Sequence, residues 1–112
     1  MERRLSDYLH HMRQAAHDAC AFVEGMTRDQ FFADKRTQQA VVMCLIIIGE
    51  AAMKVAAGHP DFVASRPDVP WRSMRGMRNR IAHGYFDIDL ELVWDTAQRD
   101  LPDLLNRLPK FP

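Results

Sequence analysis

The segment over residues 35–57 constrains the fold of this chain more than any other part of its sequence. Asp34 can cap the start of a helix there and Gly58 can serve as the C′ residue after its end, so we predict one long helix. Over residues 40–52 the side chains are apolar nearly all round, and such a helix is covered on several sides. Because 112 residues fold around one core, we expect the cover to come from that core and from a second subunit. The sequence therefore predicts a single domain over residues 1–112 that forms a homodimer.

Two features of this helix carry further expectations. Glu50 is the carboxylate inside the apolar segment, and it needs a partner if it is buried. The apolar circumference also places a subunit interface at Val42, Ile46 or neighbouring positions.

The rest of the chain has helical periodicity too, and strand-like alternation of apolar and polar residues does not occur. The predicted fold class is therefore all-α. Three prolines within residues 59–70 mark a connection with one short helical turn. The further predicted elements are a helix over 5–26, a short helix that Thr27 opens and that extends through Phe32, a basic helix over 71–82 with Pro70 in its first turn and Gly84 at its end, and a fourth helix that Asp87 or Asp89 caps and Pro102 ends or kinks.

Composition narrows the classes of partner and compartment. Lys plus Arg balances Asp plus Glu at 15 each, which gives no general attraction to nucleic acid or to an anionic membrane but is compatible with a local basic patch. Cys20 and Cys44 fall on apolar helical positions and are predicted to be buried thiols of a reducing compartment. There is no apolar signal core, and the dense apolar run over 40–49 is too short to cross a membrane, so we expect a cytoplasmic protein without membrane contact. The histidines lack a completing set of acidic or cysteine ligands, and no glycine-rich phosphate loop occurs, so neither a metal nor a cofactor is expected.

The strongest charge feature is a group of four arginines in the predicted basic helix. Arg72, Arg75 and Arg78 are spaced by three and are expected along one helix edge, whereas Arg80 points elsewhere. This edge is either a solvated face paired with carboxylates or a set of contacts to substrate phosphates. His83 follows Arg78 by five residues, about 140° around an ideal helix, so the two share a face only if the helix end departs from ideal geometry. From spacing alone, His83 is better explained as a cap of the last helix carbonyls.

The spacing Arg-x4-His-x-Tyr, formed by Arg78, His83 and Tyr85, resembles the signature of the HEPN superfamily, in particular of the HepT-type toxins. The similarity covers most of the chain, and the segments 47–52, 69–72, 76–86 and 93–94 carry it in the same order and spacing. It implies an all-α bundle of four or five helices that pairs with a second copy, so that two motifs face one cleft.

The resemblance further implies a metal-independent endoribonuclease. The RNA 2′-OH is the nucleophile and needs only a base, and an imidazole that titrates near neutrality suits this task, so His83 is expected to transfer the proton. Arg78 would stabilise the charge on the phosphorane, while the histidines of two subunits would act as base and acid. Asn79 would orient His83 or bind a non-bridging oxygen. Glu50 would pair with Arg78 or Arg80, either in support of catalysis or as a purely structural salt bridge.

Tyr85 has two interpretations. It could pack on the bundle after the helix-ending Gly84, as Phe86 beside it would. The resemblance instead implies that a nucleotidyltransferase antitoxin attaches AMP to Tyr85, which would fill the cleft and stop cleavage. Two alternatives to a toxin stay open: a non-catalytic module that assists a nucleotidyltransferase, and an RNA-binding dimer without turnover.

Overall fold

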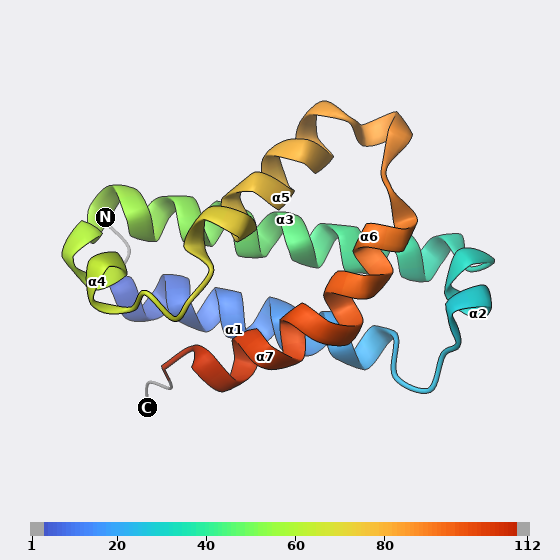
Figure 1. Ribbon diagram of the computed structural model, residues 1–112, viewed down its shortest axis with the longest axis horizontal. Helices are drawn as coiled ribbons and strands as arrows, with labels where there is room; N and C mark the ends of the chain where they lie inside the picture. The colour runs from blue at the N-terminus through green and yellow to red at the C-terminus, as the bar shows by residue number, and fades with distance from the viewer. Residues whose placement is uncertain (1–3, 110–112) are drawn as a thin grey trace.

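The computed structural model describes residues 4–109, apart from the side chain of Tyr85. Every regular element in this part of the chain is helical (Figure 1), which confirms the predicted all-α bundle. The elements are α1 Leu5–Phe22, α2 Arg28–Phe32, α3 Lys35–Gly58, α4 Pro60–Ser65, α5 Trp71–His83, the 3-10 turn η1 Tyr85–Asp87, α6 Leu90–Asp95, the π turn η2 Thr96–Asp100 and α7 Leu101–Arg107.

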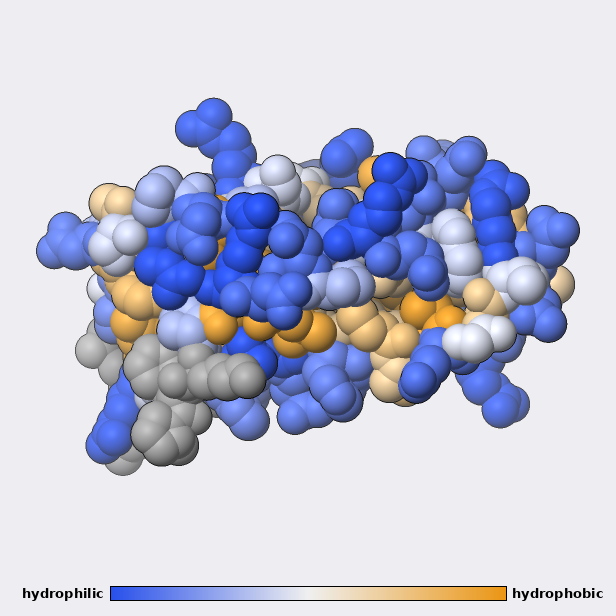
Figure 2. All heavy atoms as spheres, turned by 60° about the horizontal axis from the view of Figure 1, so that its bottom comes forward, coloured by the Kyte–Doolittle hydropathy of each residue, from blue (hydrophilic) through white to orange (hydrophobic). Residues whose placement is uncertain are grey.

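The antiparallel helices α1 and α3 form the centre of the bundle (Figure 1). α5 leans against α3, and the continuous helical run from α6 through η2 to α7 returns along α1. Small residues of α1 let the two central helices approach, since Ala15, Ala16 and Ala19 are all buried. The face that contains α1 and α7 is mostly hydrophilic, with apolar side chains in a broken band across it (Figure 2).

The predicted cap of α3 is present. The Asp34 carboxylate accepts the backbone N–H of Thr37 at 3.1 Å and the Thr37 hydroxyl at 2.8 Å. These hydrogen bonds lower the pKa of the Asp34 carboxyl. At the other end the prediction for Gly58 was wrong, because Gly58 is the last helical residue and has no positive φ. His59 leaves the helix instead, since a residue before proline, here Pro60, is kept out of the helical conformation.

α3 is the core helix, although one stretch of it stays in contact with solvent. Val41, Leu45 and Ile48 are buried, whereas the side chains of Met43 and Ile47 are 55% and 38% exposed. Contrary to the expectation from its densest run, α3 is the one helix in the described part of the chain that is long and apolar enough to cross a membrane. Half of its apolar window is buried inside the fold, which is typical of the core helix of a bundle.

Two helix ends differ from prediction for local reasons. α1 ends at Phe22, four residues early, because Gly25 adopts a left-handed φ of 77° and turns the chain. Pro102 does not end the last helix: the π turn η2 directly precedes it, and α7 continues with the proline in its first turn. Of the two capping candidates, Asp89 is the one that caps α6, at 3.1 Å from the Leu92 nitrogen.

Candidate active site on α5

α5 crosses α3 at Gly49, and this crossing positions the guanidinium of the motif. A Cβ added at Gly49 would overlap the Cβ of Arg78 and would lie 2.9 Å from the carbonyl oxygen of Met74. Only a hydrogen atom fits there, so the stem of Arg78 passes directly over α3 and its head reaches Glu50. Our sequence interpretation used Gly49 only as part of the resemblance. The available signal was a glycine inside an apolar helix, which destabilises a helix by about 1 kcal/mol relative to alanine and so calls for a reason.

The guanidinium of Arg78 is held on two sides. Its Nε donates to Oε1 of Glu50 at 2.7 Å, and its Nη2 lies 2.5 Å from the same oxygen. Its Nη1 donates to Oδ1 of Asn79 at 3.1 Å. Three of the five N–H donors are thus engaged, and two are left for an acceptor that the described residues do not supply. Glu50 therefore pairs with Arg78 and not with Arg80. Asn79 accepts from Arg78, where we had expected it to orient His83 or to bind a non-bridging oxygen.

His83 lies on a different side of the same helix. α5 remains helical through His83, and Gly84 closes it by donating its N–H to the carbonyl of Arg80 at 2.9 Å. The helix end does not depart from regular geometry, so Arg78 and His83 project about 140° apart within one chain. The imidazole is exposed, and no described residue makes a hydrogen bond or ion pair with it. The interpretation of His83 as a cap of the last carbonyls therefore has no contact in its favour.

A different set of α5 residues shares the exposed face with His83. Arg72, Gly76, Asn79 and His83 follow one another at i, i+4, i+7 and i+11, which is one row along a helix surface. We call this row the α5 ridge. Arg78 is not on it, because its side chain starts on the face turned to α3 and reaches the ridge through Asn79. The prediction that Arg72, Arg75 and Arg78 lie along one edge was therefore wrong for Arg78.

The remaining arginines of α5 divide between its two flanks. Arg72 on the ridge and Arg75 beside it are exposed and form no ion pair with any described residue. For Arg72 and Arg75, the interpretation as a face paired with carboxylates is thus without support. Arg80 lies on the other flank, where it lines a hollow together with Asp87 and Asp89.

The turn after α5 projects from the bundle. The backbone of Tyr85 opens η1 directly after Gly84, and the Tyr85 side chain lies outside the described residues. Phe86 is 97% exposed, so its expected packing on the bundle was wrong. The tight 3-10 turn carries the chain past the end of α5 before it returns at Ile88 (Figure 1). Phe86 lines a groove with Met43 and Ile46 of α3.

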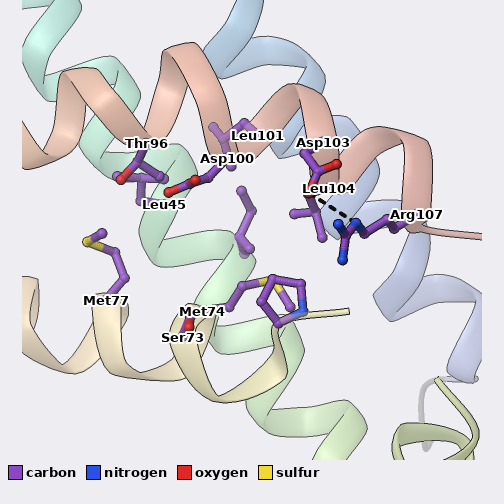
Figure 3. Close-up of a pocket in the computed structure, with 12 residues that line it drawn as sticks. Leu45, Ser73, Met74, Met77, Thr96, Asp100, Leu101, Asp103, Leu104 and Arg107 are labelled. Carbon is purple, nitrogen blue, oxygen red and sulfur yellow. Dashed lines mark ion pairs between the residues drawn. The ribbon is translucent and has the colours of Figure 1, made fainter. Parts of the chain in front are cut away.

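A separate cavity of about 260 Å³ lies between α3, α5 and the run from η2 to α7 (Figure 3). The α5 side contributes Met74 and Met77, and the C-terminal helix contributes the Asp103–Arg107 ion pair at 3.0 Å. Arg78 and His83 do not line this cavity, so the cavity is separate from the motif.

The described residues contain no group of three or more His, Cys, Asp or Glu side chains that could hold a metal ion. Both cysteines are free thiols, but Cys20 is only half-buried, so the prediction of burial was wrong for it. Cys44 is buried, and this burial raises the pKa of its thiol to about 11.

Comparison with known proteins assigns the family. The family model "Ribonuclease HepT-like" matches residues 12–111, which contain the whole of α3 and α5. The chain belongs to the HepT-like ribonuclease family. This HepT-like chain is 36% identical over 111 residues to "Probable ribonuclease HepT" of Thermococcus cleftensis, with 99% of this chain and 98% of that protein covered. It is 35% identical over 107 residues to "Putative RNase MJ0127" of Methanocaldococcus jannaschii, with 96% and 83% covered. No solved structure matches the chain significantly.

Proposed function

We propose that this HepT-like protein is a metal-independent endoribonuclease toxin that acts in the cytoplasm as a homodimer. The observation that carries the proposal is the guanidinium of Arg78, which Glu50 and Asn79 orient while two of its N–H donors stay available. Family membership and the names of the relatives support RNA as the substrate.

The chemistry needs only the groups that α5 carries. A neutral imidazole of His83 removes the proton of the ribose 2′-OH, and the resulting oxygen attacks the adjacent phosphorus. The bond from phosphorus to the 5′-oxygen breaks, and a second, protonated imidazole returns a proton to that oxygen. A 2′,3′-cyclic phosphate and a 5′-hydroxyl result. The two remaining donors of Arg78 stabilise the charge on the pentacoordinate phosphorus without a metal ion.

The second imidazole comes from a second subunit in this proposal. Within one chain Arg78 and His83 project to different sides of α5. In the proposed dimer, the His83 of a facing copy therefore lies beside the Arg78 of the first copy. Exposed apolar side chains offer an interface, namely Met43 and Ile47 of α3 and Phe86 of η1. Val42, one of the positions first expected there, is already buried within one chain.

Light scattering at micromolar concentration tests the assembly. We expect a dimeric mass for the parent protein and a monomeric one for Ile47→Asp, because a carboxylate cannot be buried there without a partner. Phe22→Asp is the matched control, since Phe22 is a similarly exposed apolar residue outside this region and its variant should stay dimeric. A monomeric parent protein contradicts the proposal.

The test of catalysis is cleavage of single-stranded RNA by purified variants. His83→Ala and Arg78→Ala should each lower the rate by about 100-fold or more, as expected for the loss of a proton-transfer group or of charge stabilisation. His10→Ala controls for loss of an exposed histidine elsewhere, and it should cleave normally. Addition of EDTA should not change the rate. Full activity of His83→Ala refutes the mechanism, and tight RNA binding without any cleavage by the parent protein favours the binding-module alternative.

We propose further that a nucleotidyltransferase antitoxin controls the enzyme through Tyr85. The tyrosine hydroxyl would attack the α-phosphorus of ATP, pyrophosphate would leave, and the hydroxyl proton would pass to solvent. The position of Tyr85 supports this, because it opens a turn that projects from the bundle two residues beyond His83. The added phosphate would compete with RNA for Arg78.

Mass spectrometry after co-expression with a cognate nucleotidyltransferase tests this control. The parent chain should gain one or more AMP units, and Tyr85→Phe should gain none and should keep its ribonuclease activity. Tyr8→Phe is the control, because Tyr8 is the only other tyrosine of the chain and its loss should leave modification unchanged. Equal inhibition of Tyr85→Phe by the partner contradicts covalent control.

A further inference from the structure

Gly76 is placed in the middle of the α5 ridge without a structural reason in the described part of the chain. It lies inside a helix, where glycine is less favourable than almost any other residue. A Cβ added there would meet no atom of a described residue within 4 Å, and Gly76 has no positive φ that would require a glycine. The contrast with Gly49 in α3 is sharp, because there the Cβ would overlap Arg78. Gly76 therefore leaves a bare patch of helix backbone on an exposed row.

The neighbours of this bare patch indicate what approaches it. Arg72 precedes Gly76 by one turn and Asn79 follows it by one turn, with Arg75 beside them. Both arginines are exposed and form no ion pair with any described residue. Such unpaired positive charges attract a polyanion. Close backbone approach of a ligand is also a general reason for glycine on a surface.

We propose that the sugar–phosphate backbone of the RNA substrate comes closest to α5 at Gly76, where a side chain would hold it away. This inference rests on the proposed ribonuclease function and adds a residue that determines how the substrate is bound. The ridge runs about 16 Å from Arg72 to His83, at about 1.5 Å per residue, and Gly76 lies about 10 Å from His83. Gly76 therefore meets nucleotides beside the cleaved bond and not the reacting atoms. The arginines on either side anchor the phosphates of those nucleotides.

The substitution Gly76→Ala separates this role from a structural one. Alanine favours the helix and fits the available space, so the variant should melt at a higher temperature than the parent. If the RNA backbone approaches at Gly76, the same variant should raise KM for a long single-stranded RNA about tenfold, because small misplacements of a substrate have large effects. The turnover number should stay near that of the parent. Cleavage of a dinucleotide, which is too short to reach Gly76 from His83, should not change.

Gly58→Ala is the matched control, because a Cβ at Gly58 also meets no described atom within 4 Å but lies far along α3 from the ridge. It should leave RNA cleavage unchanged. Binding of a 2′-O-methyl RNA, which cannot be cleaved, is measured in parallel by fluorescence anisotropy. Weaker binding to Gly76→Ala supports the inference even if the parent protein proves inactive as a nuclease. Unchanged KM and unchanged binding in Gly76→Ala overturn it, and so does a shift to monomer by light scattering, which would make Gly76 a contact between subunits.

Discussion

The crossing of α5 over α3 predicts that Gly49→Ala is far more damaging than a single methyl group suggests. The new Cβ would overlap the Cβ of Arg78 and would lie 2.9 Å from both the Arg78 Cγ and the Met74 carbonyl oxygen. Carbon atoms pack at about 3.5–4.0 Å, so α5 has to move away from α3 by roughly an ångström or more. Overpacking of this kind destabilises by about 1–3 kcal/mol. Because backbone has to move, we take the upper end, and a gain of about 1 kcal/mol in helix propensity leaves a net loss of about 2 kcal/mol.

Thermal and urea unfolding measure this effect. A loss of about 2 kcal/mol should lower Tm by about 8 °C in a domain of this size. RNA cleavage should fall at a temperature at which the variant is still folded, because Arg78 would move away from Glu50. Gly58→Ala in the same helix has no neighbour to meet and should be as stable as the parent or more so. A Gly49→Ala protein with parental Tm and parental activity would refute the idea that this glycine positions Arg78.

Three further predictions follow from individual contacts. The pKa of Asp34 is lowered in the folded protein, so the stabilisation by this cap is complete above the pH at which a free carboxyl titrates and disappears as the pH falls through the folded-state pKa. Asp34→Ala should therefore lower Tm at pH 7, and its Tm should drop less between pH 5 and 3 than that of the parent. Because burial raises the pKa of Cys44 to about 11, its thiol should react with Ellman's reagent at pH 8 only after unfolding, and fast labelling of both cysteines in the native protein would contradict its burial. Arg13 donates from Nη1 to the carbonyls of Leu105 and Leu108 at 3.0 and 2.9 Å. Arg13→Ala should therefore lower the free energy of unfolding by about 2 kcal/mol in urea titrations, and an unchanged value would show that α7 does not need this contact.

The long-range pattern of the sequence was enough to predict the architecture. The start of α3 followed from Asp34, because its side chain caps the backbone of its own helix, and the apolar circumference identified α3 as the core helix. The errors fell where neighbouring residues compete for the same backbone. Gly58 was expected to end α3, but the proline two residues later decides the geometry of His59. Pro102 was expected to end or kink a helix; it does not end one, because it lies in the first turn of α7 directly after a π turn.

The candidate site was harder to predict because its geometry depends on a contact between helices far apart in sequence. Glu50 and Arg78 were both candidates from their residue types, but which arginine Glu50 meets depends on where α5 crosses α3. That crossing is fixed by Gly49, and a spacing rule within one helix contains no information about it. For the same reason Arg78 was placed on the edge with Arg72, although its side chain starts on the face turned to α3.

The structural and the functional interpretations of Glu50 now predict different results for Glu50→Gln. The side chains of Glu50 and Arg78 are 42% and 28% exposed, so the pair contributes only about 0.5–1 kcal/mol to folding, and the amide oxygen of glutamine can still accept from Nε. A purely structural salt bridge would therefore show a Tm lower by a few degrees and unchanged kinetics. Asp95→Asn, which removes the exposed pair between Asp95 and Arg99, is the control for that outcome.

If Glu50 positions Arg78 for catalysis, the kinetic constants should move in opposite senses. Loss of the carboxylate leaves the charge of Arg78 uncompensated, so the affinity for RNA phosphate should rise and KM should fall, with a steeper dependence on salt. The guanidinium would also be less firmly oriented, because a charge-assisted hydrogen bond is replaced by a neutral one of about half the strength, so kcat should fall by about tenfold. Glu50→Asp should not restore kcat, since a side chain shorter by one methylene cannot reach Nε and Nη2 together. A Glu50→Gln protein whose KM and kcat both match the parent would leave the carboxylate a structural role alone.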